Sequence, residues 1–134
     1  MSAWALQQAI FAALASSEDI KDVVDDPPRV FDTVPRGAAF PYIVIGDDRT
    51  TNLSTATDAA SEHRLTVHVW SRASGRKEAR VAANAVIAVL DGAELTVPGF
   101  ALVDLRWLES ETSRESDGET IHAQLRFRAV LEKS

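Results

Sequence analysis

The side chains that could do chemistry in this chain are three histidines and a short series of acids and serines. His63 and His68 lie in one alternating stretch, at an odd spacing, so an extended strand would point them to opposite sides. His122 has no acid or histidine at the spacing of a metal site. The histidines therefore do not predict a metal centre, and we expect the chain to work without a metal or other cofactor.

Asp47-Asp48 followed by Glu62 is the arrangement most typical of an enzyme, because carboxylates hold the divalent ion of many nucleases against a scissile phosphate. The lysine that such a site needs near its second acid is absent, since His63 and Arg64 follow Glu62. Ser74-Gly75-Arg76-Lys77 resembles the end of a phosphate loop, but the earlier glycine of that motif is missing. A metal-dependent nuclease is therefore the least favoured alternative, and the sequence predicts a protein that is not an enzyme.

Length, charge and cysteine content narrow the class of protein further. The 134 residues fit one domain over positions 1–134, and 46% apolar residues suffice for a single core. A net charge of −6 disfavours a protein that coats nucleic acid, because such proteins neutralise phosphates with excess Lys and Arg. The absence of cysteine excludes disulfides and thiolate metal sites. No export signal and no apolar run near the ~20 residues of a membrane span is visible, so no membrane association is expected.

The first thirty-two residues predict two helices and a short strand. Apolar residues at helical spacing predict a helix from Ala3 to Ser16, and Ser17 is expected to cap a second helix that runs to Val24. Pro27-Pro28 ends that helix, and Arg29 to Asp32 is expected to form an edge strand. Six acids against two bases between Glu18 and Asp32 make this segment the most acidic part of the chain.

The middle of the chain predicts two strong strands separated by a long loop. Tyr42 to Gly46 is an unbroken apolar run, which is typical of a central strand covered on both faces. Asp47 to Ser61 is polar and without period, and loops of such length are usually functional or disordered. Glu62 to Trp70 alternates between apolar and polar residues, as a strand with one buried face does.

The last sixty residues predict one helix and a long hairpin. Ser74 is expected to cap a helix with an apolar, alanine-rich stripe that ends at Asp91-Gly92. Strands from Phe100 to about Thr112 and from about Glu119 to Leu131 then form the hairpin. The patterns of the chain together predict an α+β domain.

The register of this hairpin follows from the burial of its charges. A two-residue turn at Asp117-Gly118 would place Leu125 and Phe127 on the same face as Arg106. A shift by one residue, through a longer loop or a bulge, places them beside Val103, Leu105 and Trp107 instead, so we expect the shifted register. The opposite face of the sheet then mixes charged and aromatic side chains in the way that protein contact surfaces do. Its members are Arg64, His68, Trp70, Arg106, His122, Arg126 and Arg128.

The local sequence around the two strong strands resembles one known family. Pro35, Gly37 and Phe40-Pro41-Tyr42 lead into an apolar strand, and a charged entry leads into LTVHVWSR with a helix directly after. This order resembles the tail terminator, or tail completion, proteins of long-tailed phages and gene transfer agents. The resemblance implies a small α+β domain, with helices packed on one face of a mixed or mostly antiparallel sheet and a long C-terminal hairpin.

The resemblance also implies a function and a set of partners. Proteins of this family form a ring, typically a hexamer, at the head-proximal end of the tail tube. The ring stops tube polymerisation and joins the tail to the head connector, and DNA passes through it without specific binding. We therefore expect a structural protein that is made in the host cytoplasm and is part of a phage or gene transfer agent particle. The alternative is a head-tail connector, or stopper, that meets the portal side.

Two sets of residues are the candidate contacts. The two expected loops, from Asp47 to Ser61 and from Glu111 to Glu119, are held out by strands, so we expect them to meet the tail tube or the connector. Their charged candidates are Asp47, Asp48, Arg49, Glu111, Arg114 and Asp117. A ring also needs two different patches on each subunit, and opposite charges supply them. The candidates for this subunit contact are the acids Asp22, Asp25 and Asp26 and the bases Arg126 and Arg128.

Overall fold

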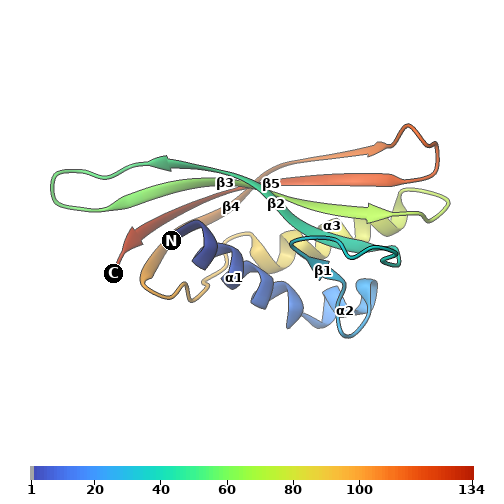
Figure 1. Ribbon diagram of the computed structural model, residues 1–134, viewed down its shortest axis with the longest axis horizontal. Helices are drawn as coiled ribbons and strands as arrows, with labels where there is room; N and C mark the ends of the chain where they lie inside the picture. Colours follow the sequence, from blue (N-terminus) through green and yellow to red (C-terminus); the bar gives the residue numbers. More distant parts are fainter. Residues whose placement is uncertain (1) are drawn as a thin grey trace.

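Helices cover one face of a twisted sheet and leave the other face uncovered in the described part of the chain, residues 2–134 of this computed structural model (Figure 1). The helices are α1 (Ser2–Ala15), α2 (Glu18–Val24) and α3 (Lys77–Leu90). The strands are β1 (Val30–Phe31), β2 (Tyr42–Asn52), β3 (Ala60–Ser71), β4 (Phe100–Arg114) and β5 (Ile121–Lys133). The predicted α+β class is confirmed, and β4 and β5 pair as one long hairpin.

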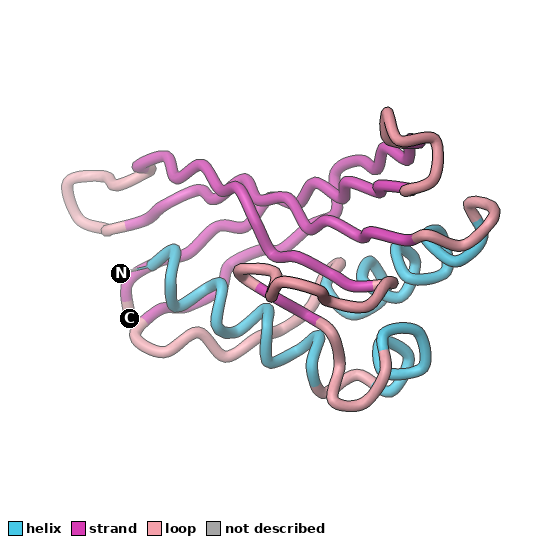
Figure 2. The backbone as a smooth tube through the Cα atoms, turned by 45° about the vertical axis from the view of Figure 1, so that its right-hand side comes forward, coloured by secondary structure: helices cyan, strands magenta, loops and turns pink. Residues whose placement is uncertain are grey.

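The sheet is mixed, in the order β1-β2-β3-β5-β4. The short edge strand β1 runs parallel to β2, and all other pairs are antiparallel. α1 packs under β1 and β2, whereas α3 packs under β3, β4 and β5. The two helices therefore divide the sheet between them, and both lie on the same side of it (Figure 2).

The core is built by alternation in the two central strands. In β3, Leu65, Val67 and Val69 are buried, and in β5 Leu125 and Phe127 are buried, while their neighbours face the other side. The alanines of α3 bring that helix close to these strands, because their side chains are small. None of the helices in the described residues is long and apolar enough to cross a membrane.

Helix ends follow the sequence at two of the expected positions. Ser17 caps α2, because its Oγ accepts a hydrogen bond of 3.3 Å from the amide of Ile20. Asp91 and Gly92 end α3, and Gly92 has a φ of 71°, a conformation that glycine adopts without a steric penalty. The expected cap at Ser74 is wrong, since α3 begins only at Lys77 and its N-cap residue Arg76 makes no side-chain capping bond.

The first expected loop is mostly strand. β2 continues through Asn52 and β3 begins at Ala60, so only residues 53–59 connect them. A bulge at Asp47, which has a φ of 35°, shifts the register, after which Thr50 and Thr51 pair with β3. Polar residues form strand here because the partner strand satisfies their backbone groups while their side chains stay exposed.

The expectation that Tyr42 to Gly46 is covered on both faces is also wrong. Ile43 and Ile45 are buried under the helices, but Tyr42 and Val44 lie half-buried on the uncovered face. An unbroken apolar run arises here because Tyr42 packs on Phe31 and Phe40 instead of on a second layer of helices.

The hairpin uses both of the registers considered from the sequence and a third one beyond its second bulge. Next to the turn, Arg114 pairs with Ile121, which is the register of the two-residue turn, although the connection spans residues 115–120. A bulge then shifts the pairing so that Trp107 lies opposite Phe127, as expected. The register rejected above is tolerated near the turn because that part of β4 is largely exposed, so its charges stay in water. Val103 departs from the expectation, since it lies in a second bulge and is exposed.

Candidate interaction surface

The uncovered face of the sheet is polar, aromatic and densely paired. Arg64, His68 and Trp70 of β3 lie beside His122, Arg126 and Arg128 of β5, as the alternation predicted. Arg106 joins them from β4, where it pairs with Arg128. Neighbouring strands therefore assemble one surface from residues far apart in the sequence.

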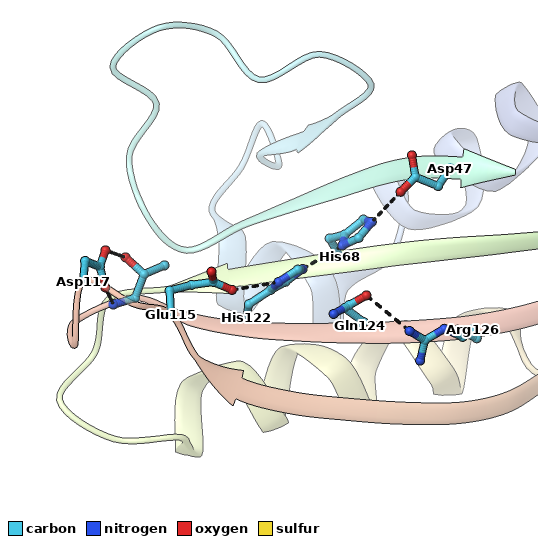
Figure 3. A network of polar contacts seen from close by, with 8 residues as sticks. Asp47, His68, Glu115, Asp117, His122, Gln124 and Arg126 are labelled. Carbon is cyan, nitrogen blue, oxygen red and sulfur yellow. Dashed lines mark hydrogen bonds and ion pairs between the residues drawn. The ribbon is translucent and has the colours of Figure 1, made fainter.

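A chain of polar contacts crosses this face (Figure 3). His68 Nδ1 lies 2.7 Å from His122 Nε2, and His122 Nδ1 lies 3.1 Å from a Glu115 carboxylate oxygen. At the other end, His68 Nε2 lies 3.9 Å from an Asp47 carboxylate oxygen. The ring of Trp70 stacks on His122 with a centroid separation of 3.7 Å. Hydrogen bonds thus join the two imidazoles to each other and to Glu115, while Trp70 stacks on His122 and Asp47 lies near His68.

Burial determines which protonation state the two histidines in this chain of contacts favour. Desolvation lowers the pKa of His68, helped by the neighbouring His122, although Asp47 opposes the shift. Desolvation also lowers the pKa of His122, against the opposing effect of Glu115. Each ring therefore favours the neutral form, in which one nitrogen donates and the other accepts.

The contact between the two histidines was not predicted from the sequence. His68 lies 54 positions away from His122 in the sequence, so no local spacing could indicate that the two residues meet across paired strands. The available signal was that both residues fall on the polar side of their alternating strands. Even so, no group of three or more potential ligands is arranged to hold a metal ion among residues 2–134.

The arginines of this face are matched by acids of the same chain. Arg126 lies 2.8 Å from Glu109 and 3.7 Å from Glu111, and Arg128 lies 2.6 Å from Glu62. Arg128 is the main reason that the pKa of Glu62 is lowered, and Arg64 adds to the effect. Because Glu62 already pairs with both Arg64 and Arg128, it is poorly placed to share a divalent ion with the acids of β2. This geometry counts against the nuclease alternative.

The expected partner residues fall into two separate places. Asp47, Asp48 and Arg49 lie at the bulge in the middle of β2, not at the mouth of a loop. Glu111 and Arg114 lie near the end of β4, and Asp117 lies in the turn after it. These two groups are not brought together, because β2 and β4 are separated by two strands.

Asp117 organises the turn of the hairpin. Its carboxylate accepts hydrogen bonds from the amides of Glu119 and Thr120, each 2.8 Å long, and one of 2.6 Å from the Thr120 hydroxyl. These bonds, led by the hydroxyl, lower the pKa of Asp117 to about 2. Arg72, whose guanidinium lies over the Phe40 ring, approaches the same carboxylate at 4.0 Å. The hairpin end is therefore an ordered structure.

The acids expected at the subunit contact lie in and directly after α2, on the helix side of the sheet. Asp25 pairs with Arg29, whereas Asp22 and Asp26 have no ion-pair partner within residues 2–134. Arg126 and Arg128 lie on the uncovered face, so the acids and the bases sit on opposite sides of the sheet. A contact between them would join two subunits and compete with the pairs that both arginines already make. The pairing of these two patches stays a prediction.

Comparison with known proteins defines the class to which this fold and surface belong. A model of the tail completion protein gp17 family matches residues 8–132. The tail completion protein gp17 of Bacillus phage SPP1 is 26% identical over 127 residues, which cover 95% of this chain and 92% of that protein. The class is therefore that of small structural proteins of virus-like tails.

Solved structures give the same result. A chain in the virion of a native gene transfer agent particle superimposes with a TM-score of 0.91 at 30% identity, covering 98% of this chain and 97% of that chain. The structure of the bacteriophage SPP1 gp17 protein has a TM-score of 0.64 at 24% identity, covering 96% and 94% of the two chains, and shows the shared fold. This chain belongs to the tail completion protein gp17 family, and the resemblance noted in the sequence is confirmed.

Proposed function

We propose that this protein forms a ring at the head-proximal end of a tail tube, ends polymerisation of the tube and joins the tail to the head connector. The observation that carries the proposal is the family match over residues 8–132. The close likeness to a chain of a gene transfer agent virion, at a TM-score of 0.91, supports a place in the particle. The proposed role is structural, and the ring is a homo-oligomer, most simply a hexamer.

The two ends of the sheet suit contacts with different partners. The β2–β3 connection projects at one end and the β4–β5 connection at the other (Figure 1). Strands hold both connections out, and exposed residues form most of each. One end would meet the tail tube protein and the other the connector or stopper protein.

The direct test is to make particles without this protein and then restore it. We expect free heads, together with tails that are unjoined and of uncontrolled length, and normal particles when the protein is supplied again. Joined particles with tails of normal length in its absence would refute the proposal. Electron microscopy of a tagged protein separates the stopper alternative, because a terminator labels isolated tails whereas a stopper labels isolated heads.

A further inference from the structure

The edge strand β4 contains two bulges, and a large apolar residue occupies each. Within the described sheet, Val103 has no partner between the pairs of Leu102 and Asp104, and Leu108 has none between the pairs of Trp107 and Glu109. Both side chains are directed away from the core, since Val103 is 55% and Leu108 is 44% exposed. Trp107, next to Leu108, is 40% exposed. Val103, Trp107 and Leu108 are called the β4 ridge below.

Such residues are unexpected at the edge of a sheet. Edge bulges commonly re-aim a side chain or end strand pairing, and exposed edges are more often protected by charges. The backbone of β4 is protected here by other means. The Trp107 amide donates to the Asp91 carboxylate at 2.9 Å, and the Gly92 amide donates to the Leu105 carbonyl at 2.7 Å. The ridge is therefore built for contact through side chains.

A matching apolar hollow lies at the other edge of the molecule. Trp4 and Phe11 stand on the outer side of α1 and are 54% and 44% exposed. Together with Gln7, Gln8, Asp32 and Ile45 they line a hollow of about 330 Å³. The hollow opens beside β2 just beyond the short strand β1, where α1 leans over the sheet. These six residues are called the α1 hollow below.

The two features also carry groups of opposite charge. Asp32 in the hollow has no ion-pair partner within residues 2–134. Arg106 reaches the edge that carries the ridge, because its Nη1 would lie 3.9 Å from a Cβ atom placed on Gly92. Its side chain is 63% exposed, and its one ion pair in the described residues is with Asp104 of the same strand. Arg106 and Asp32 are therefore candidates for an ion pair between two copies.

We infer that the β4 ridge of one subunit docks into the α1 hollow of the next, and this inference rests on the proposed ring. A closed ring needs two different patches that meet head to tail. α1 lies under β1 and β2 at one side of the sheet order and β4 is the opposite edge, so the two features lie at opposite sides of the sheet. Such a contact would cover apolar side chains on both subunits that are exposed in the single chain.

Two single substitutions test the contact from both sides. Leu108→Glu damages the ridge and leaves the hollow intact, whereas Trp4→Glu damages the hollow and leaves the ridge intact. Val81→Glu is the matched control, because Val81 is an apolar residue of α3 with a similar exposure of 46% that belongs to neither feature. Circular dichroism should show that all three variants fold.

Light scattering after size-exclusion chromatography gives the first measurement. We expect each of the two variants to be a monomer, the control to have the wild-type mass, and an equal mixture of the two variants to form a dimer and nothing larger. The dimer arises because the mixture holds one intact ridge and one intact hollow. If the wild type is larger than a monomer and either variant alone has the wild-type mass, the inferred contact is wrong. That result would leave the proposed ring itself unaffected.

Cross-linking tests the same contact in assembled particles, and it applies also where the ring forms only on the tail. The chain has no cysteine, so Trp4→Cys with Leu108→Cys introduces one candidate disulfide between neighbours. Oxidised particles should yield a ladder of covalent multimers up to the full ring, and Val81→Cys with Leu108→Cys should not. Absence of the ladder from particles that contain several copies would overturn the contact, whereas a single copy in each particle would overturn the proposed ring.

Discussion

Two imidazoles that share one hydrogen bond are expected to make the stability of this protein depend on pH. The charged groups that act on the pair are Asp47, Arg126, Glu111 and Glu115. His68 and His122 are neutral when folded, because burial outweighs the acids and lowers the pKa of each below the ordinary value near 6.5. As pH falls below 6.5, the unfolded chain takes up protons that the folded chain resists, so folding stability is lost toward acid.

The free energy of unfolding should therefore decrease from pH 7.5 to pH 5. Urea denaturation at several pH values measures this dependence, and His68→Gln should reduce it by removing one of the titrating groups. Part of the slope should remain, because burial also lowers the pKa of His63. His63→Gln provides a comparison at a histidine outside the pair. A slope that is unchanged in both variants would contradict the assignment of the pH dependence to these rings.

Strong periodicity made some elements predictable from the sequence, and its absence hid others. The alternation of β3 and the alanine-rich stripe of α3 each have one buried face, so local pattern and final burial agree. The outer part of β2 is polar on both faces, and its strand conformation comes from pairing with β3, which no local pattern reports. The sequence predicted that the hairpin needs a register shift. It did not show that two bulges in β4 divide the hairpin into three registers.

The revised boundaries of the first connection allow a precise deletion. The Leu53 amide donates to the Ala60 carbonyl at 2.9 Å, so Asn-Gly in place of residues 54–59 would close the hairpin with a two-residue turn. Stability should change by no more than about 1 kcal/mol, because a shorter loop costs less entropy while one bond from the Lys133 amide to the Ala59 carbonyl is lost.

This shortened protein should melt near the parent temperature and fail to complete tails. Thermal denaturation measures the first outcome, and electron microscopy of particles made with the variant measures the second. The double variant Thr55→Ser, Thr57→Ser keeps the loop length and serves as the control. Normal joined particles from the shortened protein would place the contact elsewhere, whereas loss of the cooperative melt would show that the connection is needed for folding.

The charge of the whole molecule leads to a prediction about DNA. The net charge is −6, and most arginines of the uncovered face are paired with acids. Phosphate binding requires free bases, and the affinity that such bases provide falls steeply with salt. In the proposed ring, through which a genome would pass, weak binding of the duplex would be an advantage.

We therefore expect no measurable binding of duplex DNA at physiological salt. Fluorescence anisotropy with a labelled duplex tests this expectation. The double variant Glu109→Gln, Glu111→Gln serves as a comparison, because it releases Arg126 from its two acids. Submicromolar affinity of the parent protein that weakens steeply with added salt would contradict the prediction.

Two hydrogen bonds between the end of α3 and the edge of β4 affect which chains can pair with that edge. Asp91 and Gly92 occupy backbone groups of Trp107 and Leu105 at the middle of that edge. A foreign extended chain that added itself there would have to displace them, so indiscriminate stacking of sheets into fibrils is opposed. In the proposed ring, each subunit would therefore select its neighbour by the shape of side chains, which discriminates between partners, instead of by a backbone pattern that every protein shares.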